Sequence, residues 1–260
     1  MKKSISLSIV VILLSISFVG CQEGFLAISG EGDIVTQEIE ISEFEAVELA
    51  GKFDVEISYG DGYSMNVEGH QNIIDRLELD YSNGDLEIKL KRGNYRNIDM
   101  KIFLTVPDIQ GVKLSGSGDI IFNKFENLGV LNISISGSGN IFSNDTVFAQ
   151  TTDFNISGSG DIDFLLEGEK VYSTISGSGN VNLAGMCNSH EITISGSGSY
   201  NCFNFITENT GITISGSGDC SVFVNSLLDI SISGSGDVYY KGEPQINSNI
   251  SGLGGFHNSN

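Results

Sequence analysis

One short motif recurs along the second half of this chain and constrains its fold more than any other feature. The motif is a hydrophobic residue, then Ser-Gly-Ser-Gly, then a polar residue, mostly Asp or Asn, and then another hydrophobic residue. Copies begin at Ser115, Ser136, Ser157, Ser176, Ser195, Ser215 and Ser233, with a degenerate copy at Ser251. The steps between them are 21, 21, 19, 19, 20, 18 and 18 residues. A near-constant period of this length is typical of a solenoid in which each repeat forms one coil.

The residues on either side of each turn alternate between apolar and polar, as in 131–135 and 161–164. This alternation predicts strands buried on one face. We therefore expect an all-β fold, a parallel β-helix (β-solenoid) with 18–21 residues per coil and its hydrophobic residues inside. The glycine pairs are expected to permit positive φ at a sharp corner and close stacking of successive backbones. Cys202 and Cys220 stand where other copies carry Phe or Ile, so both are predicted to be core residues.

The N-terminal part is more charged and less regular. Residues 47–55 are a weaker copy of the motif, with Ala50 in the place of its first serine, and the 65 residues from there to Ser115 would hold about three more coils. Residues 77–90 read as two alternating strands around Asn83-Gly84, which predicts a hairpin that caps the solenoid. The expected domains are an N-terminal β-section with the first coils, 33–110, and the repeat solenoid, 111–256.

The start of the chain predicts export. Met1-Lys2-Lys3 is positive, and an apolar run from Ile5 to Val19 leads to Gly20-Cys21. The run is shorter than the roughly 18 to 20 residues that a membrane-spanning helix needs. Residues 18–21 resemble a bacterial lipobox, which predicts a lipoprotein signal peptide over 1–20, lipid attachment at Cys21 and a flexible tether over 21–32; an ordinary secretory signal is the alternative. Gln22 after the cysteine favours the outer membrane under the sorting rule for bacterial lipoproteins.

The charge balance excludes several partners. Removing residues 1–20 leaves 33 acidic residues against 13 − 2 = 11 basic ones, a net charge of −22. This argues against nucleic acid and against docking on anionic lipid. Solubility explains the acidity, with a surface for cations or a basic partner as the alternative. Beyond Cys21 there are three cysteines and no CxxC spacing, which disfavours a disulfide framework or a thiolate metal site.

The Asp or Asn after each turn forms a column when the coils are stacked. Its members are Asp119, Asn140, Asp161, Asn180, Ser199, Asp219 and Asp237. Stacked carboxylates repel one another, so calcium is one interpretation. The other, which we favour, is a polar ladder in which these side chains hydrogen-bond to local amides.

Catalytic signatures are weak. The repeated serines would need a base, and none of His70, His190 and His257 stands in a motif with a serine. A glycosidase needs only two facing carboxylates, and so acidic a rod offers many pairs. Tyr239 and Tyr240 fit either the sealing of a core end or stacking on sugars. We assign no catalytic, cofactor-binding or metal-binding residue.

A lipoprotein-type signal, the Leu49–Ile57 segment, the Asn83–Leu90 segment and the serial motifs together make the chain similar to a known family. Over about residues 44–241 it resembles the "putative auto-transporter adhesin, head GIN domain" family of Bacteroidetes lipoproteins. The resemblance implies a right-handed β-helix and a surface or periplasmic location, and it carries over no catalytic residue.

From these features we predict a non-enzymatic cell-envelope lipoprotein, lipid-anchored through Cys21 and acting as an adhesin or surface-interaction scaffold. Its expected partners are the membrane, through the lipid, and glycans or surface proteins, but not nucleic acid. The alternatives are a solenoid-type carbohydrate-active enzyme and a structural, calcium-stabilised envelope element.

Overall fold

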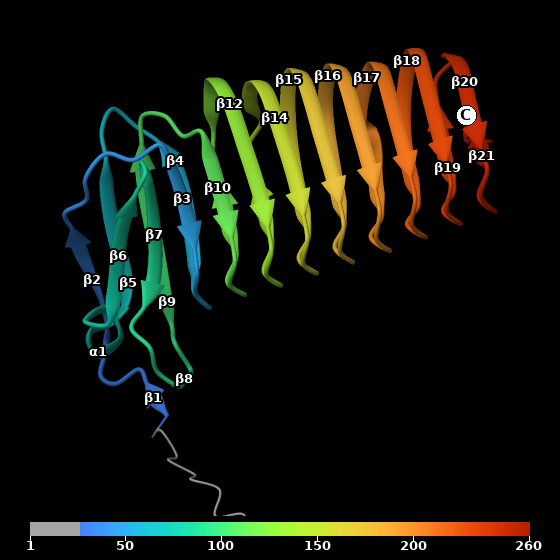
Figure 1. The fold of residues 1–260 in the computed structure, drawn as a ribbon. Helices are drawn as coiled ribbons and strands as arrows, with labels where there is room; N and C mark the ends of the chain where they lie inside the picture. Colours follow the sequence, from blue (N-terminus) through green and yellow to red (C-terminus); the bar gives the residue numbers. More distant parts are fainter. Residues whose placement is uncertain (1–26) are drawn as a thin grey trace, which may run out of the picture.

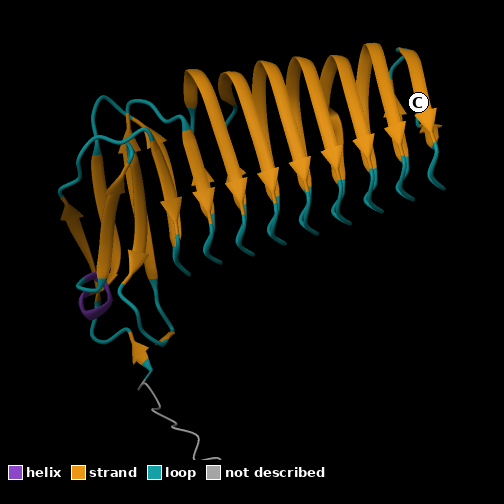
Figure 2. Ribbon diagram, viewed as in Figure 1, coloured by secondary structure: helices purple, strands orange, loops and turns teal. Residues whose placement is uncertain are grey.

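The computed structural model describes residues 27–260, and these form an elongated rod built almost wholly of strands (Figures 1 and 2). The one helix in this part of the chain, α1 (Gln71–Ile74), spans a single turn near one end. Residues 27–260 contain no helix long and apolar enough to cross a membrane. The predicted signal peptide and Cys21 lie outside the described residues.

The rod is a β-solenoid, as the repeat predicts. Its strands are β10 (Gly111–Leu114), β11 (Ile120–Phe122), β12 (Phe125–Ile135), β13 (Ile141–Ser143), β14 (Val147–Ile156), β15 (Ile162–Ile175), β16 (Val181–Ile194), β17 (Tyr200–Ile214), β18 (Cys220–Ile232), β19 (Val238–Lys241), β20 (Gln245–Ile250) and β21 (Phe256–Asn258). Each coil pairs with the next in parallel, so that Ile156 faces Ile175, which faces Ile194.

Two sheets run the length of the rod. The turn-entry sheet contains the segments that lead into each Ser-Gly-Ser-Gly turn, such as β10 and the last residues of β12 and β14 to β18, and it ends in β20. The turn-exit sheet contains the segments that follow each turn, such as β11, β13 and the first residues of β15 to β18, and it ends in β19 and β21. In β15 to β18 one bent strand supplies both sheets.

Columns of apolar side chains fill the space between the sheets. Phe164 packs edge-to-face on Phe122 and Phe154, with ring centroids 5.4 and 5.6 Å apart. Cys220 lies in the Ile120 column, between Tyr200 and Val238, and Cys202 is 1 % exposed, so the prediction that both are core residues is confirmed.

The turn glycines are required by stacking and not by positive φ. A Cβ on Gly158 would lie 2.0 Å from the carbonyl oxygen of Gly137, and one on Gly160 would lie 1.8 Å from that of Gly139. The same holds along the whole series of turns, yet none of these glycines has positive φ. The expectation of positive φ was therefore wrong, and the expectation of close stacking is confirmed.

The N-terminal section differs from the predicted run of coils. Its strands are β1 (Ile28–Ser29), β2 (Ile34–Ile39), β3 (Ala46–Leu49), β4 (Asp54–Tyr59), β5 (Ser64–His70), β6 (Leu77–Ser82), β7 (Asp85–Leu90), β8 (Tyr95–Arg96) and β9 (Met100–Val106). β3 and β4 pair directly with β10 and β11, so the Ala50 coil stacks beneath the Ser115 coil. The 65 residues between them do not form three coils. They leave the stack to build one further rung, β7 and β9, together with antiparallel strands.

Those antiparallel strands cover the N-terminal end of both sheets. β6 closes the turn-entry sheet through its hairpin with β7, and Asn83 and Gly84 both have positive φ, as a two-residue hairpin turn requires. β5 and then β2 close the turn-exit sheet. The predicted capping hairpin is confirmed. The described part of the expected tether is not free, because β1 pairs with β8 and Asn72 donates a hydrogen bond to the Ser29 carbonyl.

Candidate functional site

The polar column beside the turns is a hydrogen-bond ladder between coils. The Oδ1 atom of Asp119 accepts from the backbone N–H of Asn140 at 2.8 Å, and Asn140 Oδ1 accepts from the N–H of Asp161 at 3.0 Å. The pattern begins at Asp54, continues through Asn180, and resumes from Asp219 to Asp237 and from Asp237 to Gly255. Each side chain thus satisfies the amide that leaves the next turn, rather than an amide of its own turn as expected.

This arrangement uses one side-chain oxygen, Oδ1, of each Asp and Asn in the column. Asn140 and Asn180 also donate from Nδ2 to the Oδ1 atoms of Asp119 and Asp161, both at 3.0 Å, and they separate neighbouring carboxylates with a neutral group. Within residues 27–260 no three His, Cys, Asp or Glu side chains are placed to hold a metal ion. The geometry therefore favours the ladder interpretation of the column.

A buried polar cluster lies inside the solenoid, and no motif in the sequence predicts it. His190 Nε2 is 2.9 Å from the Tyr200 hydroxyl and 3.2 Å from the Ser173 hydroxyl, and the two hydroxyls are 2.8 Å apart. His190 and Tyr200 are fully buried, and burial lowers the pKa of His190 to about 3. Although a serine and a histidine meet here, the core encloses them, so a substrate does not reach them and the cluster is structural.

The outward face of the turn-entry sheet carries a regular array of residues, most of which are polar. Because alternate residues of a strand point outward, each coil contributes two of them at fixed register. One row contains Ser134, Asn155, Thr174, Thr193, Thr213, Ser231 and Asn249. The parallel row contains Asn132, Asp153, Tyr172, Glu191, Gly211, Asp229 and Asn247. We call these two rows the polar face.

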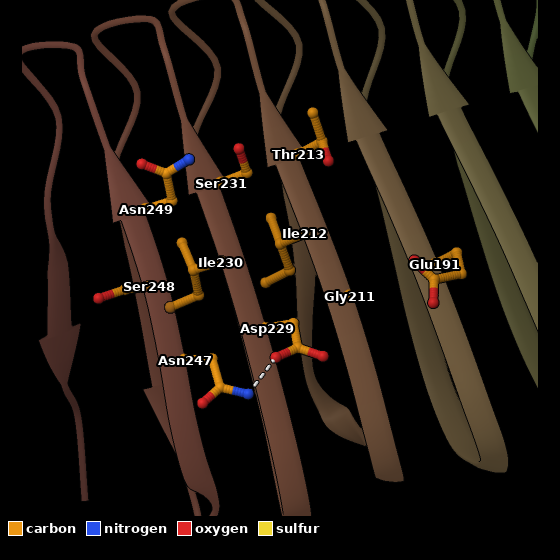
Figure 3. A pocket seen from close by; sticks show the side chains of 10 residues that line it. All are labelled: Glu191, Gly211, Ile212, Thr213, Asp229, Ile230, Ser231, Asn247, Ser248 and Asn249. Atoms are coloured by element: carbon orange, nitrogen blue, oxygen red, sulfur yellow. Dashed lines mark hydrogen bonds between the residues drawn. The ribbon is translucent and has the colours of Figure 1, made fainter.

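A shallow hollow of about 330 Å³ opens in the polar face at Gly211 (Figure 3). Gly211 has no side chain to fill the space between Glu191 and Asp229 in the neighbouring coils, and the Glu191 carboxylate leans over it. Asp229 Oδ1 accepts a hydrogen bond of 2.7 Å from Asn247 Nδ2. The hollow therefore presents two carboxylates and an amide without an aromatic side chain in its lining.

A second hollow, about 370 Å³, lies in the same sheet at Gly111, in the row of Gly211. The Lys113 ammonium lies 2.7 Å from the Glu48 carboxylate at its edge. Five coil steps separate the two glycines, which is about 24 Å at the usual spacing of neighbouring strands. These open hollows suit a ligand that lies along the surface better than a small molecule that must be enclosed.

A mostly apolar row, which we call the apolar row, lies where the turn-exit segments bend toward the turn-entry sheet. Its members, in register, are Phe148, Glu167, Met186, Ile206 and Phe223. Met186 is 52 % exposed and Ile206 is 41 % exposed, with Leu165 nearby at 37 %. Farther along, Tyr240 packs on Phe256 beside the core, which fits the sealing role, whereas Tyr239 stacks on His257 outside.

The family comparison agrees with this architecture. The family model described as "Putative auto-transporter adhesin, head GIN domain" matches residues 43–141 and 125–244. The chain belongs to this family. The head GIN fold therefore includes both the capped N-terminal section and the repeat solenoid of this chain, and the resemblance noted in the sequence is confirmed.

Solved structures share the head GIN fold at low identity. A "putative lipid binding protein" from Parabacteroides distasonis is 26 % identical with a TM-score of 0.84, covering 90 % of this chain and 100 % of its own. A "putative adhesin" from Parabacteroides merdae is 22 % identical with a TM-score of 0.81, covering 90 % and 99 %. A "putative adhesin" from Bacteroides fragilis is 20 % identical with a TM-score of 0.67, covering 89 % and 100 %. Among curated proteins, none matches the sequence.

Proposed function

We propose that this protein is a non-enzymatic, lipid-anchored adhesin of the cell envelope that binds glycans or surface proteins through its polar face. The observation that carries the proposal is the pair of hydroxyl, amide and carboxylate rows repeated at every coil. Such groups exchange hydrogen bonds readily with sugar hydroxyls and with peptide groups, and they recur at about 4.8 Å along the rod. Adhesin titles among the solved structures of the same fold are in keeping with it.

The net charge of the chain limits which classes of partner can bind to it. The formal net charge is −20, and the row with Glu191 also carries Asp153 and Asp229. Anionic polysaccharides and anionic membranes would be repelled. We therefore expect neutral or basic glycans, or proteins with a neutral or basic surface.

The same face argues against the enzyme alternative. A glycosidase places a protonated carboxylic acid and a second carboxylate on either side of the glycosidic bond that it cleaves. Here the Asp229 carboxylate is engaged by Asn247, and the hollow is open and lacks an aromatic platform for a sugar ring.

Binding is tested on arrays of glycans and matrix proteins with the unacylated chain from residue 22 onward, with and without calcium, while scoring product release. We expect specific binding without cleavage. Thr193→Lys with Thr213→Lys should abolish it, whereas Asn182→Lys with Asn201→Lys, on the turn-exit face of the same coils, adds equal charge and should preserve it. Product release, or equal loss in both variants, would contradict the proposal.

Anchoring is tested separately in cells. The proposed lipid on Cys21 would hold the N-terminal end of the rod at the outer membrane. A Cys21→Ser variant should lose incorporation of a fatty-acid label and leave the membrane fraction. Unchanged label and unchanged fractionation would contradict lipid attachment at this residue.

A second candidate function rests on the apolar row. The exposed Met186, Ile206 and Leu165 side chains could hold a lipid chain, and the relative from Parabacteroides distasonis bears a lipid-binding title. Binding of a fluorescent fatty acid, lost in Met186→Asp and retained in Thr193→Lys, would favour this role over adhesion through the polar face.

A further inference from the structure

The two ends of the rod are built differently. At the N-terminal end the outermost strands, β2 and β6, carry acidic side chains such as Glu38, Glu78 and Asp80. At the C-terminal end the outermost strands are β20 and β21, each paired on one side only, with β18 and β19 respectively (Figure 1). From Pro244 to Asn260 the sequence contains no Asp, Glu, Lys or Arg.

Charged side chains on an edge strand normally prevent pairing with another chain. The N-terminal end has this protection and the C-terminal end lacks it, in a chain whose net charge is −20. The outer backbone N–H and C=O groups of β20 and β21 are therefore open to another strand, without a charged side chain beside them.

The final coil also exposes apolar side chains. Leu253, which stands where earlier turns have a serine, is 91 % exposed. Ile250 is 39 % exposed, whereas Ile232, its partner in the preceding coil, is 1 % exposed. Phe256 lies only partly buried against the core. This end of the rod thus combines open strand edges with uncovered core positions.

We propose that two copies of this chain pair end to end through β20 and β21. A two-fold axis perpendicular to the rod would set each strand antiparallel to its own copy, so that both sheets continue and the contact is closed. Pairing with the N-terminal end of another copy is disfavoured, because its acidic edges would meet an end without a Lys or Arg side chain. It would also leave an open filament.

This pairing has a consequence that rests on the proposed anchoring at Cys21. The N-terminal section and the final coil lie at opposite ends of the rod (Figure 1). Two chains joined at their final coils would therefore carry their anchors at the far ends of a doubled rod. Such a pair would join two facing membranes and provide adhesion between like cells.

The unacylated chain from residue 22 tests the pairing by sedimentation velocity and small-angle scattering over a wide range of concentrations. We expect a dimer about twice as long as the monomer. Leu253→Asp, at a site that is almost fully exposed, should weaken it, and Leu253→Asp with Ile250→Asp should abolish it. Leu165→Asp, on the side of the rod, is the matched control and should leave the dimer intact.

Three outcomes would overturn the proposal: a monomer at every concentration, a dimer no longer than the monomer, or a dimer that survives both charges. Array binding of Leu253→Asp separates this result from the proposed adhesin role, because the polar face is unchanged in that variant. Loss of pairing with retained glycan binding would leave the adhesin proposal standing.

Discussion

At the scale of single residues, the solenoid depends on the absence of side chains at its turns. Each turn glycine lies against a carbonyl oxygen of the preceding coil. A Cβ atom on the glycine would come within 1.8 to 2.0 Å of that oxygen, which is closer than the two atoms can approach. Neighbouring coils are held at strand spacing by their ladders, so the backbone cannot move apart at one turn without loss of hydrogen bonds on both sides. Glycine is therefore a packing requirement here.

Gly158→Ala is expected to lower the free energy of unfolding by more than about 2 kcal/mol, because the new methyl group would overlap the Gly137 backbone. Gly129→Ala is the control, since a Cβ there meets nothing within 4 Å. Urea denaturation followed by circular dichroism measures both. Equal midpoints for the two variants would refute the packing argument.

The buried His190 should make the stability depend on pH. Its pKa is about 3 in the folded chain, against about 6.5 when unfolded, so below pH 6.5 the unfolded state binds a proton that the folded state does not. The contribution of the neutral, buried His190 to the free energy of unfolding is therefore complete above pH 6.5, and it is lost as the pH falls toward 3. Between pH 7 and pH 5 the loss should be about 2 kcal/mol.

His190→Leu tests this dependence in the same denaturation assay at pH 7 and pH 5. Leucine fits the column, since Leu228 occupies it two coils later, and Ser173 and Tyr200 still bond to each other. The variant should show little loss between the two pH values. His257→Asn, at an exposed histidine, should keep the full loss. A loss that persists in His190→Leu would mean that another group titrates.

At the scale of elements, the polar ladder completes the hydrogen bonding between coils. Backbone bonds such as Ser138 N–H to the Gly116 carbonyl continue through the turns, and the side chains take the amide that follows each turn. Each amide that leaves a turn would otherwise lack a protein acceptor, and the Asp or Asn one coil earlier supplies it. The Ser199 backbone N–H donates to Asn180 Oδ1, but the short Ser199 side chain accepts no such bond from the amide of Asp219 in this structure. The ladder is therefore broken between these two coils.

Ser199→Asn should repair the break and raise the free energy of unfolding by about 1 kcal/mol, the usual net value of one hydrogen bond. Ser199→Ala is the control and should change stability little, because the backbone N–H of residue 199, not its side chain, donates to Asn180 Oδ1. Thermal or urea unfolding measures both. A stabilisation common to both variants would show that the ladder is not its cause.

At the scale of the whole molecule, the shape and the charge of the rod together determine how two copies associate. The rod presents a polar face, an apolar row and two dissimilar ends, and its negative charge makes copies repel one another in solution. Association through the uncharged final coil must overcome that general repulsion, which acts over a distance set by the salt concentration.

The proposed dimer should therefore become tighter as sodium chloride is raised, since salt screens the repulsion between two chains that each carry a net charge of −22 without residues 1–20. Sedimentation at low and high salt measures the dissociation constant. Weakening by salt would instead indicate a contact held by ion pairs, although residues 244–260 contain no Asp, Glu, Lys or Arg.

Much of this fold could be predicted from the sequence, and the reasons are local. The period of the Ser-Gly-Ser-Gly motif, the alternation beside it and the polar residue after it specify the coils, the inward columns with Cys220 and Cys202, and the Asp119 to Asp237 column. These signals recur, so each copy reinforces the interpretation of the others.

Other features of the fold could not be predicted from the sequence, because they depend on pairing between residues that are distant in the chain. Whether the Ala50 coil continues into its neighbours in sequence or stacks on the Ser115 coil is a choice between competing strand edges, and local pattern does not settle it. The meeting of Ser173, His190 and Tyr200 depends on which columns face each other across the core. The hollow at Gly211 depends likewise on the register of three neighbouring coils. The sequence period sets the number of residues in each coil, whereas contacts across and between coils form only when the chain folds into the solenoid.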